Sequence, residues 1–305
     1  MIIVFLLTAL GVGYYGQHVQ KEAKSLYIKS MNVTFGKPSS DYDFKSAEDN
    51  NSTFKYEPEV ANYMGLGIDT EYFGLGVEFT DGVGDKKPDE SDYRSPSNVY
   101  DIQVSGIKDQ VLWDIYYQKY SGLYIEKEFD QNELVSTNFG FGFLYAFESN
   151  IEAKKILKNL EHQKQTGYSW LVGASVNRNI LKSTDEIVPG QFSDKFKELQ
   201  NIDKIATNSF SLDLGWGGQY IWNNVFINGL VTIGLVYQEQ KLFNKDYKSY
   251  NEPASSNNIE LGFGYKLKRG LTGLSAKFQT FNTKLAEQEI NQSRTKSYFY
   301  YRHFF

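Results

Sequence analysis

The chain lacks cysteine altogether, and its 305 residues include only 6 prolines and 3 histidines. Without cysteine there is no disulfide scaffold, no thiolate metal site and no cysteine nucleophile, and three histidines leave little material for metal or acid–base chemistry. With 32 Lys and Arg against 37 Asp and Glu, the net charge of −5 gives no basic footprint for binding nucleic acid. Runs of about 18 apolar residues are also missing, which excludes a helical membrane protein. A membrane β-barrel remains compatible, because alternation dilutes its apolar residues.

The chain is instead rich in aromatic residues, which make up 16% of it, and in strict alternation of apolar and polar side chains. In 259–267, apolar residues at the odd positions alternate with Glu260, Gly262, Gly264 and Lys266. A period of two over this length predicts a strand with one apolar face and one polar or small face. Counting such runs predicts about twelve strands, near 26–36, 60–69, 71–80, 98–107, 110–120, 136–147, 166–178, 207–221, 224–240, 256–268, 271–282 and 294–305.

The connections between these strands alternate in length. Short turns are predicted at 69–71, 108–109, 222–224 and 268–270, and long polar loops at 37–56, 81–97, 121–135, 179–206, 241–255 and 283–293. This alternation is typical of a bacterial outer-membrane barrel with both termini on the periplasmic side. Two segments have roughly helical spacing: 148–165, for which a long, kinked strand is the alternative, and 190–206 in an outer loop.

Both ends of the chain carry signals. An apolar run at 2–12 followed by small residues predicts an export signal over residues 1–17 and a barrel over 18–305. No Lys or Arg precedes the run, and a first buried strand is the alternative. At the other end Phe299, Tyr301 and Phe305 share one face of the last strand. This ending resembles that of outer-membrane barrels, whose last strand is recognised by the barrel-assembly machinery, although His303 departs from the pattern.

Alternation alone does not say which face of the barrel is outside. A soluble barrel turns its apolar face inward and its charges outward. Here the other face consists mostly of Gly, Ser, Asn and Gln, which suits a crowded interior, and aromatic residues near strand ends, such as Tyr168, Trp170, Trp216 and Trp222, suit the two membrane interfaces. We therefore predict an all-β fold: a transmembrane antiparallel up-and-down β-barrel of about twelve strands. We expect a monomer in the outer membrane of a Gram-negative bacterium, in contact with outer-membrane lipid.

Three stretches resemble an uncharacterised family. They are FKYEPEVANYMGLGIDTEYFGLGVEF at 54–79, VYDIQVSGIKDQVLWDIYYQKYSGLY at 99–124 and QKQTGYSWLVG at 163–173, and they are similar to the motifs of domain of unknown function 4421. The chain departs from those motifs at Glu59 and at 166–167. The resemblance implies an exported outer-membrane barrel and brings no activity with it.

The alternation turns a line of charged side chains toward the lumen. The acids are Asp69, Glu78, Asp101, Asp114, Asp213 and Glu260, and the counter-charges are Lys266, Lys277 and Arg302. One interpretation is a selectivity lining for a small hydrophilic solute; the other is a set of salt bridges that fills a narrow, closed lumen. On one strand, Asp114, Tyr116 and Gln118 form either a solute-binding wall or a row packed over the glycines of neighbouring strands.

Three classes of function stay open. We favour a narrow pore or a binding barrel for a small solute or lipid. A lipid-modifying, phospholipase-like enzyme would depend on His162 or His303 as base, and neither has a Ser at matching height. A structural or adhesion barrel would act through its outer loops. We predict no catalytic residue, no cofactor and no metal site, and we interpret the acidic loop at 81–95 as a solvated surface loop rather than a divalent-cation site.

Overall fold

The computed structural model describes residues 27–46, 52–58, 62–70, 73–80, 97–108, 110–125, 134–147, 166–243, 248–285 and 288–305. The predicted export signal, the predicted helix at 148–165 and the acidic loop at 81–95 lie outside the described residues. Within those residues no helix has the length and apolar character needed to cross a membrane.

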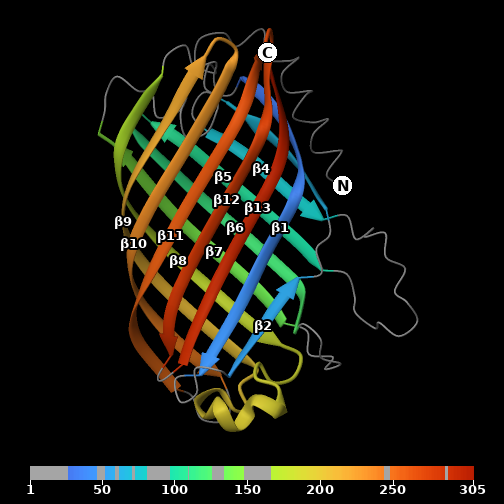
Figure 1. Cartoon of the computed structure of the whole chain (residues 1–305), viewed down its shortest axis with the longest axis vertical. Coiled ribbons are helices and arrows are strands. Elements are labelled where there is room, and N and C mark those ends of the chain that lie inside the picture. The colour runs from blue at the N-terminus through green and yellow to red at the C-terminus, as the bar shows by residue number, and fades with distance from the viewer. Residues whose placement is uncertain are drawn as a thin grey trace, which may run out of the picture.

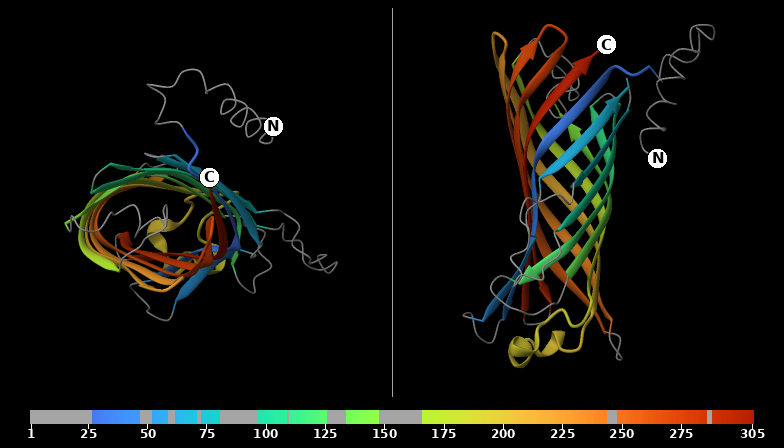
Figure 2. Two further views of the ribbon diagram at one scale, coloured as in Figure 1. Left: turned by 90° about the horizontal axis from the view of Figure 1, so that it is seen from above. Right: turned by 90° about the vertical axis from the view of Figure 1, so that its right-hand side faces the viewer.

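One antiparallel sheet closes into a barrel (Figures 1 and 2). Its strands are β1 (Ser30–Ser46), β2 (Thr53–Pro58), β3 (Tyr63–Asp69), β4 (Phe73–Thr80), β5 (Asn98–Lys108), β6 (Val111–Ile125), β7 (Leu134–Ala146), β8 (Gly167–Ser183), β9 (Lys204–Trp222), β10 (Val225–Phe243), β11 (Lys248–Leu267), β12 (Gly270–Leu285) and β13 (Gln288–Phe304). The seam pairs the whole of β1 with the whole of β13, from Ser30 opposite Phe304 to Ser46 opposite Gln288. Closure leaves no free sheet edge at this seam.

The barrel contains twelve strands at one end and ten at the other, because β2 and β3 share one position beside β1. β3 pairs with β1 over residues 30–36, and β2 pairs with β1 over residues 42–45. Near the C-terminus the wall consists of β1 and β3–β13, whereas at the far end it consists of β1, β2 and β6–β13. β6 changes partner from β5 to β2 at an irregularity between Tyr120 and Leu123, where Gly122 has a positive φ of 74°. The prediction of a closed, twelve-stranded antiparallel barrel is confirmed.

Apolar side chains cover the outside of the barrel toward the end at which the C-terminus lies. Leu214 and Leu235 are 61% and 77% exposed, and their outward neighbours Leu212, Ile233 and Trp216 are exposed as well. Polar and small residues alternate with them on the inner face. An apolar exterior around a polar interior is the arrangement of a membrane barrel, not of a soluble one, so the barrel belongs to the outer membrane. We call this exposed apolar zone the membrane belt.

The strands continue beyond the membrane belt, and there the alternation changes phase. On β1, Met31 and Val33 point outward within the belt, whereas further along Tyr42 and Phe44 are buried inside and the outward positions are charged. Inward apolar residues from most of the wall form a core that fills this outer end. The barrel is therefore of the membrane type at one end and of the soluble type at the other.

Residues 184–203, which we call the cap, close the outer end (Figures 1 and 2). The cap contains two short 3₁₀ helices, η3 (Gly190–Lys195) and η4 (Lys197–Leu199), and β9 follows at Lys204. The prediction of a helix over 190–206 is thus correct only for these short turns. Five apolar cap residues are fully buried in the core: Ile187, Val188, Phe196, Leu199 and Ile202.

The short turns are found where they were predicted, for example between Trp222 and Val225, where Asn223 has a positive φ of 56°. Three of the predicted long loops are wrong. β1 ends at Ser46 and β2 begins at Thr53, β10 ends at Phe243 and β11 begins at Lys248, and β12 ends at Leu285 and β13 begins at Gln288. The segments 37–56, 241–255 and 283–293 are therefore mostly strand. Polar residues such as Ser40, Gln288 and Gln292 are buried there as well, which weakens the alternation that identifies a strand.

Candidate functional site

A charged cluster crosses the interior at the level of the membrane belt. The Lys296 ammonium group of β13 forms ion pairs with Glu78 and, at 3.7 Å, with Asp101 Oδ2. Gln118 Nε2 donates to the same Asp101 oxygen at 2.9 Å, and Arg294 Nη1 donates to Gln118 Oε1 at 3.2 Å. Two of the predicted lumen acids and Gln118 are thus linked to cations of the last strand.

Further ion pairs involve other predicted residues. Arg302 Nη1 lies 3.1 Å from Asp69 Oδ2, and Ser30 Oγ donates to that oxygen at 2.8 Å, so one carboxylate joins β13, β1 and β3. Lys277 Nζ lies 2.7 Å from Glu260 Oε1 on the neighbouring strand. Six of the nine predicted charges therefore lie in ion pairs, two of them with Lys296, which favours salt bridges inside the barrel over a ring of free charge.

Four predicted residues lie apart from these ion pairs. The Tyr116 ring occupies the space in front of Gly140, as expected for tyrosines packed over glycines. Asp213 accepts a hydrogen bond from Ser211 Oγ at 2.8 Å. Lys266 is partly exposed near the turn into β12, and no ion pair joins Asp114 to another described residue.

Sequence reasoning missed a polar network centred on Tyr42. The Tyr42 hydroxyl lies 2.5 Å from Ser136 Oγ of β7, and it accepts hydrogen bonds from Gln292 Nε2 at 2.5 Å and from Asn179 Nδ2 at 3.2 Å. Asn138 joins it through Asn179 and Arg294. The network links β1 and β13 to β7 and β8 across the interior. The sequence does indicate Arg294 and Lys296, because both lie an even number of residues from Arg302 on the same strand and so share its inward face.

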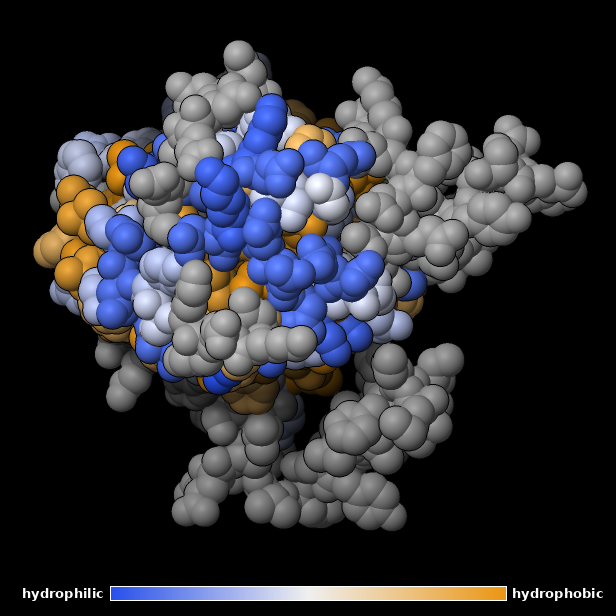
Figure 3. All heavy atoms as spheres, turned by 90° about the horizontal axis from the view of Figure 1, so that it is seen from below, coloured by the Kyte–Doolittle hydropathy of each residue, from blue (hydrophilic) through white to orange (hydrophobic). Residues whose placement is uncertain are grey.

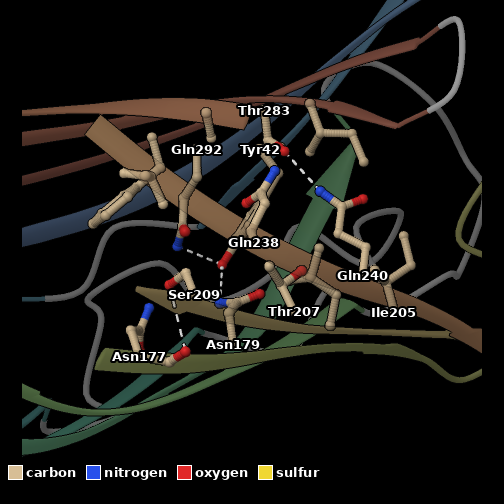
Figure 4. A pocket seen from close by; sticks show the side chains of 15 residues that line it. Tyr42, Asn177, Asn179, Ile205, Thr207, Ser209, Gln238, Gln240, Thr283 and Gln292 are labelled. Carbon is tan, nitrogen blue, oxygen red and sulfur yellow. Dashed lines mark hydrogen bonds between the residues drawn. The ribbon is translucent and has the colours of Figure 1, made fainter. Parts of the chain in front are cut away.

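A cavity lies beside this network, directly beneath the core of the outer end (Figure 4). Its volume is about 50 Å³, which leaves room for a few water molecules or a small solute. Its lining contains no charged side chain: Tyr42, Asn177, Asn179, Leu181, Ile205, Thr207, Ser209, Val236, Gln238, Gln240, Ala254, Phe281, Thr283, Ile290 and Gln292.

Three buried polar atoms in this lining have no hydrogen-bond partner: Asn177 Oδ1, Gln238 Nε2 and Gln240 Oε1. Gln238 and Gln240 are almost completely buried, and Gln240 uses its other amide atom to donate to Thr283 Oγ1 at 2.6 Å. A buried polar atom without a partner costs about 1–3 kcal/mol. The cavity therefore offers two hydrogen-bond acceptors and one donor that the protein itself leaves unused.

The cap separates the cavity from the outside. Phe196 contacts Phe54 edge-on with the ring centroids 4.9 Å apart, and the Tyr56 hydroxyl donates to the Ile187 carbonyl at 2.9 Å. Lys195 Nζ donates to Ser52 Oγ at 2.7 Å at the rim. Figure 3 shows hydrophilic side chains spread over this end, with hydrophobic ones visible between them and along the flanks.

The residues weighed for catalysis are not assembled into a site. His303 is partly exposed at the C-terminal end, and its Nδ1 lies 3.2 Å from the Tyr301 hydroxyl. His162 lies outside the described residues. In the described part of the chain no group of three or more His, Asp or Glu side chains is arranged to hold a metal ion.

The last strand presents its aromatic residues together. Phe299, Tyr301 and Phe305 all lie on the exposed outward face, and the His303 ring contacts Phe305 with the centroids 5.2 Å apart. Recognition of this face by the assembly machinery stays a prediction.

Comparison with known proteins identifies a family. The family described as Domain of unknown function (DUF4421) matches residues 18–303, and no curated protein matches the sequence. Among solved structures, the outer membrane protease OmpT from Escherichia coli is 9% identical with a TM-score of 0.42, covering 91% of this chain and 97% of that one. The translocator domain of the autotransporter NalP from Neisseria meningitidis is 9% identical with a TM-score of 0.41, covering 100% and 96%. With such identities and scores, these similarities carry no argument about function.

Proposed function

The chain belongs to the family described as Domain of unknown function (DUF4421), and we propose that it is an outer-membrane binding barrel for a small, uncharged, polar solute. The observation that carries this proposal is the set of three unpaired amide atoms in the cavity lining, Asn177 Oδ1, Gln238 Nε2 and Gln240 Oε1. A bound solute would supply the hydrogen bonds that the protein leaves unmade.

The lining also sets the chemical class of the solute. Two acceptors and one donor match a compound with hydroxyl or amide groups, since each of these groups supplies donors as well as an acceptor. A charged solute would lose part of its hydration without meeting an opposite charge, which is unfavourable in a site lined only by uncharged side chains. Tyr42 and Phe281 add aromatic surface for the carbon skeleton.

The filled interior of the outer end favours a binding barrel and argues against a permanently open pore. The apolar core and the five buried cap side chains fill the interior at that end, and water and ions do not cross a closely packed apolar core. The charges deeper in the barrel agree with a binding barrel, because the Lys296–Glu78 ion pair and the Arg294–Gln118 hydrogen bond join β13 to the opposite wall instead of lining a channel.

The test is a calorimetric titration of the refolded, detergent-solubilised protein with glycerol, glucose and urea, together with gluconate as a charged analogue. We expect one of the neutral solutes to bind and gluconate not to. Gln238→Leu and Gln240→Leu each remove a hydrogen bond to the solute, so binding weakens about tenfold or more in each.

Glu239→Gln is the matched control, because Glu239 lies between these two residues on β10 and its side chain points outward to Lys241. Its affinity for the solute is expected to equal that of the wild type. The proposal fails if the folded protein binds none of the neutral solutes, or if both Leu variants retain the wild-type affinity.

A further inference from the structure

The outer wall of β6–β9 carries a group of cations directly above the membrane belt. Lys119 follows the outward Tyr117 on β6, and Arg178 follows the exposed Val176 on β8. Further out, Lys182 of β8 lies directly opposite Lys204 of β9 in the antiparallel register. We call Lys119, Arg178, Lys182 and Lys204 the basic face.

Among the described residues, no acidic side chain neutralises the basic face. None of its four side chains forms an ion pair within the described part of the chain, and Lys204 Nζ instead lies over the Phe243 ring, 4.5 Å from the centroid. Like charges directly opposite each other in an antiparallel pair are destabilising. A compensating anion would therefore stabilise Lys182 opposite Lys204.

The outermost cations of β1 and β2, the strands that follow β6 around the outer end, are paired with acidic side chains. At the same outer level Lys45 Nζ lies 3.5 Å from Asp43 Oδ2, and Lys55 Nζ lies 3.3 Å from Asp41 Oδ2 and also contacts Glu57. Burial alone would lower the pKa of Lys55, but the hydrogen bond to Glu57 and the charge of Asp41 outweigh burial and raise it. The outermost cations of β1 and β2, Lys45 and Lys55, are thus paired, whereas the four cations of the basic face are not.

We propose that the basic face binds a phosphate-bearing lipid of the outer leaflet. The acyl chains of such a lipid would lie against the exposed Phe139 and Val176 of the membrane belt, and its phosphate groups would reach the cations immediately above. An arginine guanidinium binds phosphate in a bidentate manner, and lysines bind it as point charges. The combination of an apolar wall below and unpaired cations above fits an anionic amphiphile better than a soluble anion. This inference does not depend on the solute cavity.

The test measures binding of diphosphorylated lipid A to the refolded full chain in neutral detergent by native mass spectrometry, with dephosphorylated lipid A and inorganic phosphate as comparison ligands. The double variant Lys182→Gln, Lys204→Gln loses two surface cations, each worth about fivefold in affinity, so we expect binding to weaken about 25-fold. The control Lys45→Gln, Lys55→Gln removes the same charge from paired lysines and is expected to change the affinity less than about threefold.

Arg178→Gln is a second variant in case the double variant does not fold, and we expect about fivefold weaker binding from it. The proposal is overturned if the control weakens binding as much as the basic-face variant does, or if dephosphorylated lipid A binds as tightly. Inorganic phosphate that binds to the same face with the affinity of the lipid would also overturn it, since the site would then recognise a free anion.

Discussion

Shortening one cap side chain, Phe196→Ala, tests whether the cap is held by its apolar contacts. Phe196 is fully buried against Phe54 in the core of the outer end. Truncation of a buried Phe to Ala costs about 3–5 kcal/mol. The backbone hydrogen bonds between the strands do not depend on this ring, so the lost free energy mainly destabilises the closed position of the cap. Even 3 kcal/mol raises the open population on the order of 100-fold.

The assay is limited trypsin digestion of the folded protein, because Lys195 and Lys197 lie within the cap. When opening and closing are faster than cleavage, the cleavage rate follows the open population. Phe192→Ala is the matched control: this ring also stacks on Phe54, at 5.1 Å, but it is only partly buried, so the rate should rise about tenfold at most. Cleavage of Phe196→Ala at the wild-type rate would refute the reasoning.

Three further outcomes are expected. In planar bilayers the wild type should show no stable unitary currents, because the apolar core and the cap close the outer end, and Phe196→Ala should show brief openings. Steady currents from the wild type would contradict this closure. Asp69→Asn leaves Arg302 unpaired inside the wall and should lower the free energy of unfolding by about 3 kcal/mol in urea titrations in detergent, whereas Asp213→Asn, which breaks no ion pair, should cost clearly less. Because the pKa of Lys55 is raised, its contribution is complete below its ordinary pKa and is lost as the pH rises through the raised value. The stability difference between wild type and Lys55→Met, less than about 1 kcal/mol, should therefore shrink above about pH 10.5, and a difference that grows with pH would show the sign to be wrong.

The sequence predicted the part of the barrel that lies in lipid. Within the membrane belt the outward side chains must be apolar and the inward ones polar or small, so runs such as 259–267 reveal both the strand and its faces. The turns at 222–224 and 268–270 were predictable because each is a short break between two strongly alternating runs.

The outer half was harder to predict, because the same strand faces lipid at one end and water at the other. Beyond Phe35, the outward positions of β1 become charged or polar and the inward ones become apolar at Tyr42 and Phe44. Averaged over the strand, this change of phase looks like a polar loop. The reversed alternation DYDFK at 41–45 is nevertheless present in the sequence, and it is the signal that would have located the outer core.

The solute cavity was not predictable from local patterns. Its lining comes from seven strands between β1 and β13, and what makes it a candidate site is the missing partners of Asn177, Gln238 and Gln240. Whether these atoms find hydrogen-bond partners depends on how far along the barrel axis the side chains of different strands lie. The alternation of residues within one strand does not determine this. The predicted lumen charges, by contrast, follow from parity alone.

The seam has a consequence for how the protein becomes watertight. Phe44 of β1 and Ile290 of β13 lie directly opposite each other across it, and both belong to the core of the outer end. The core of the outer end therefore includes side chains of both the first and the last strand of the barrel, and it is complete only once these strands have paired. A barrel in which β1 and β13 have not paired would have free sheet edges and an unblocked interior. The permeability of the membrane that contains it would therefore report on the completion of its assembly.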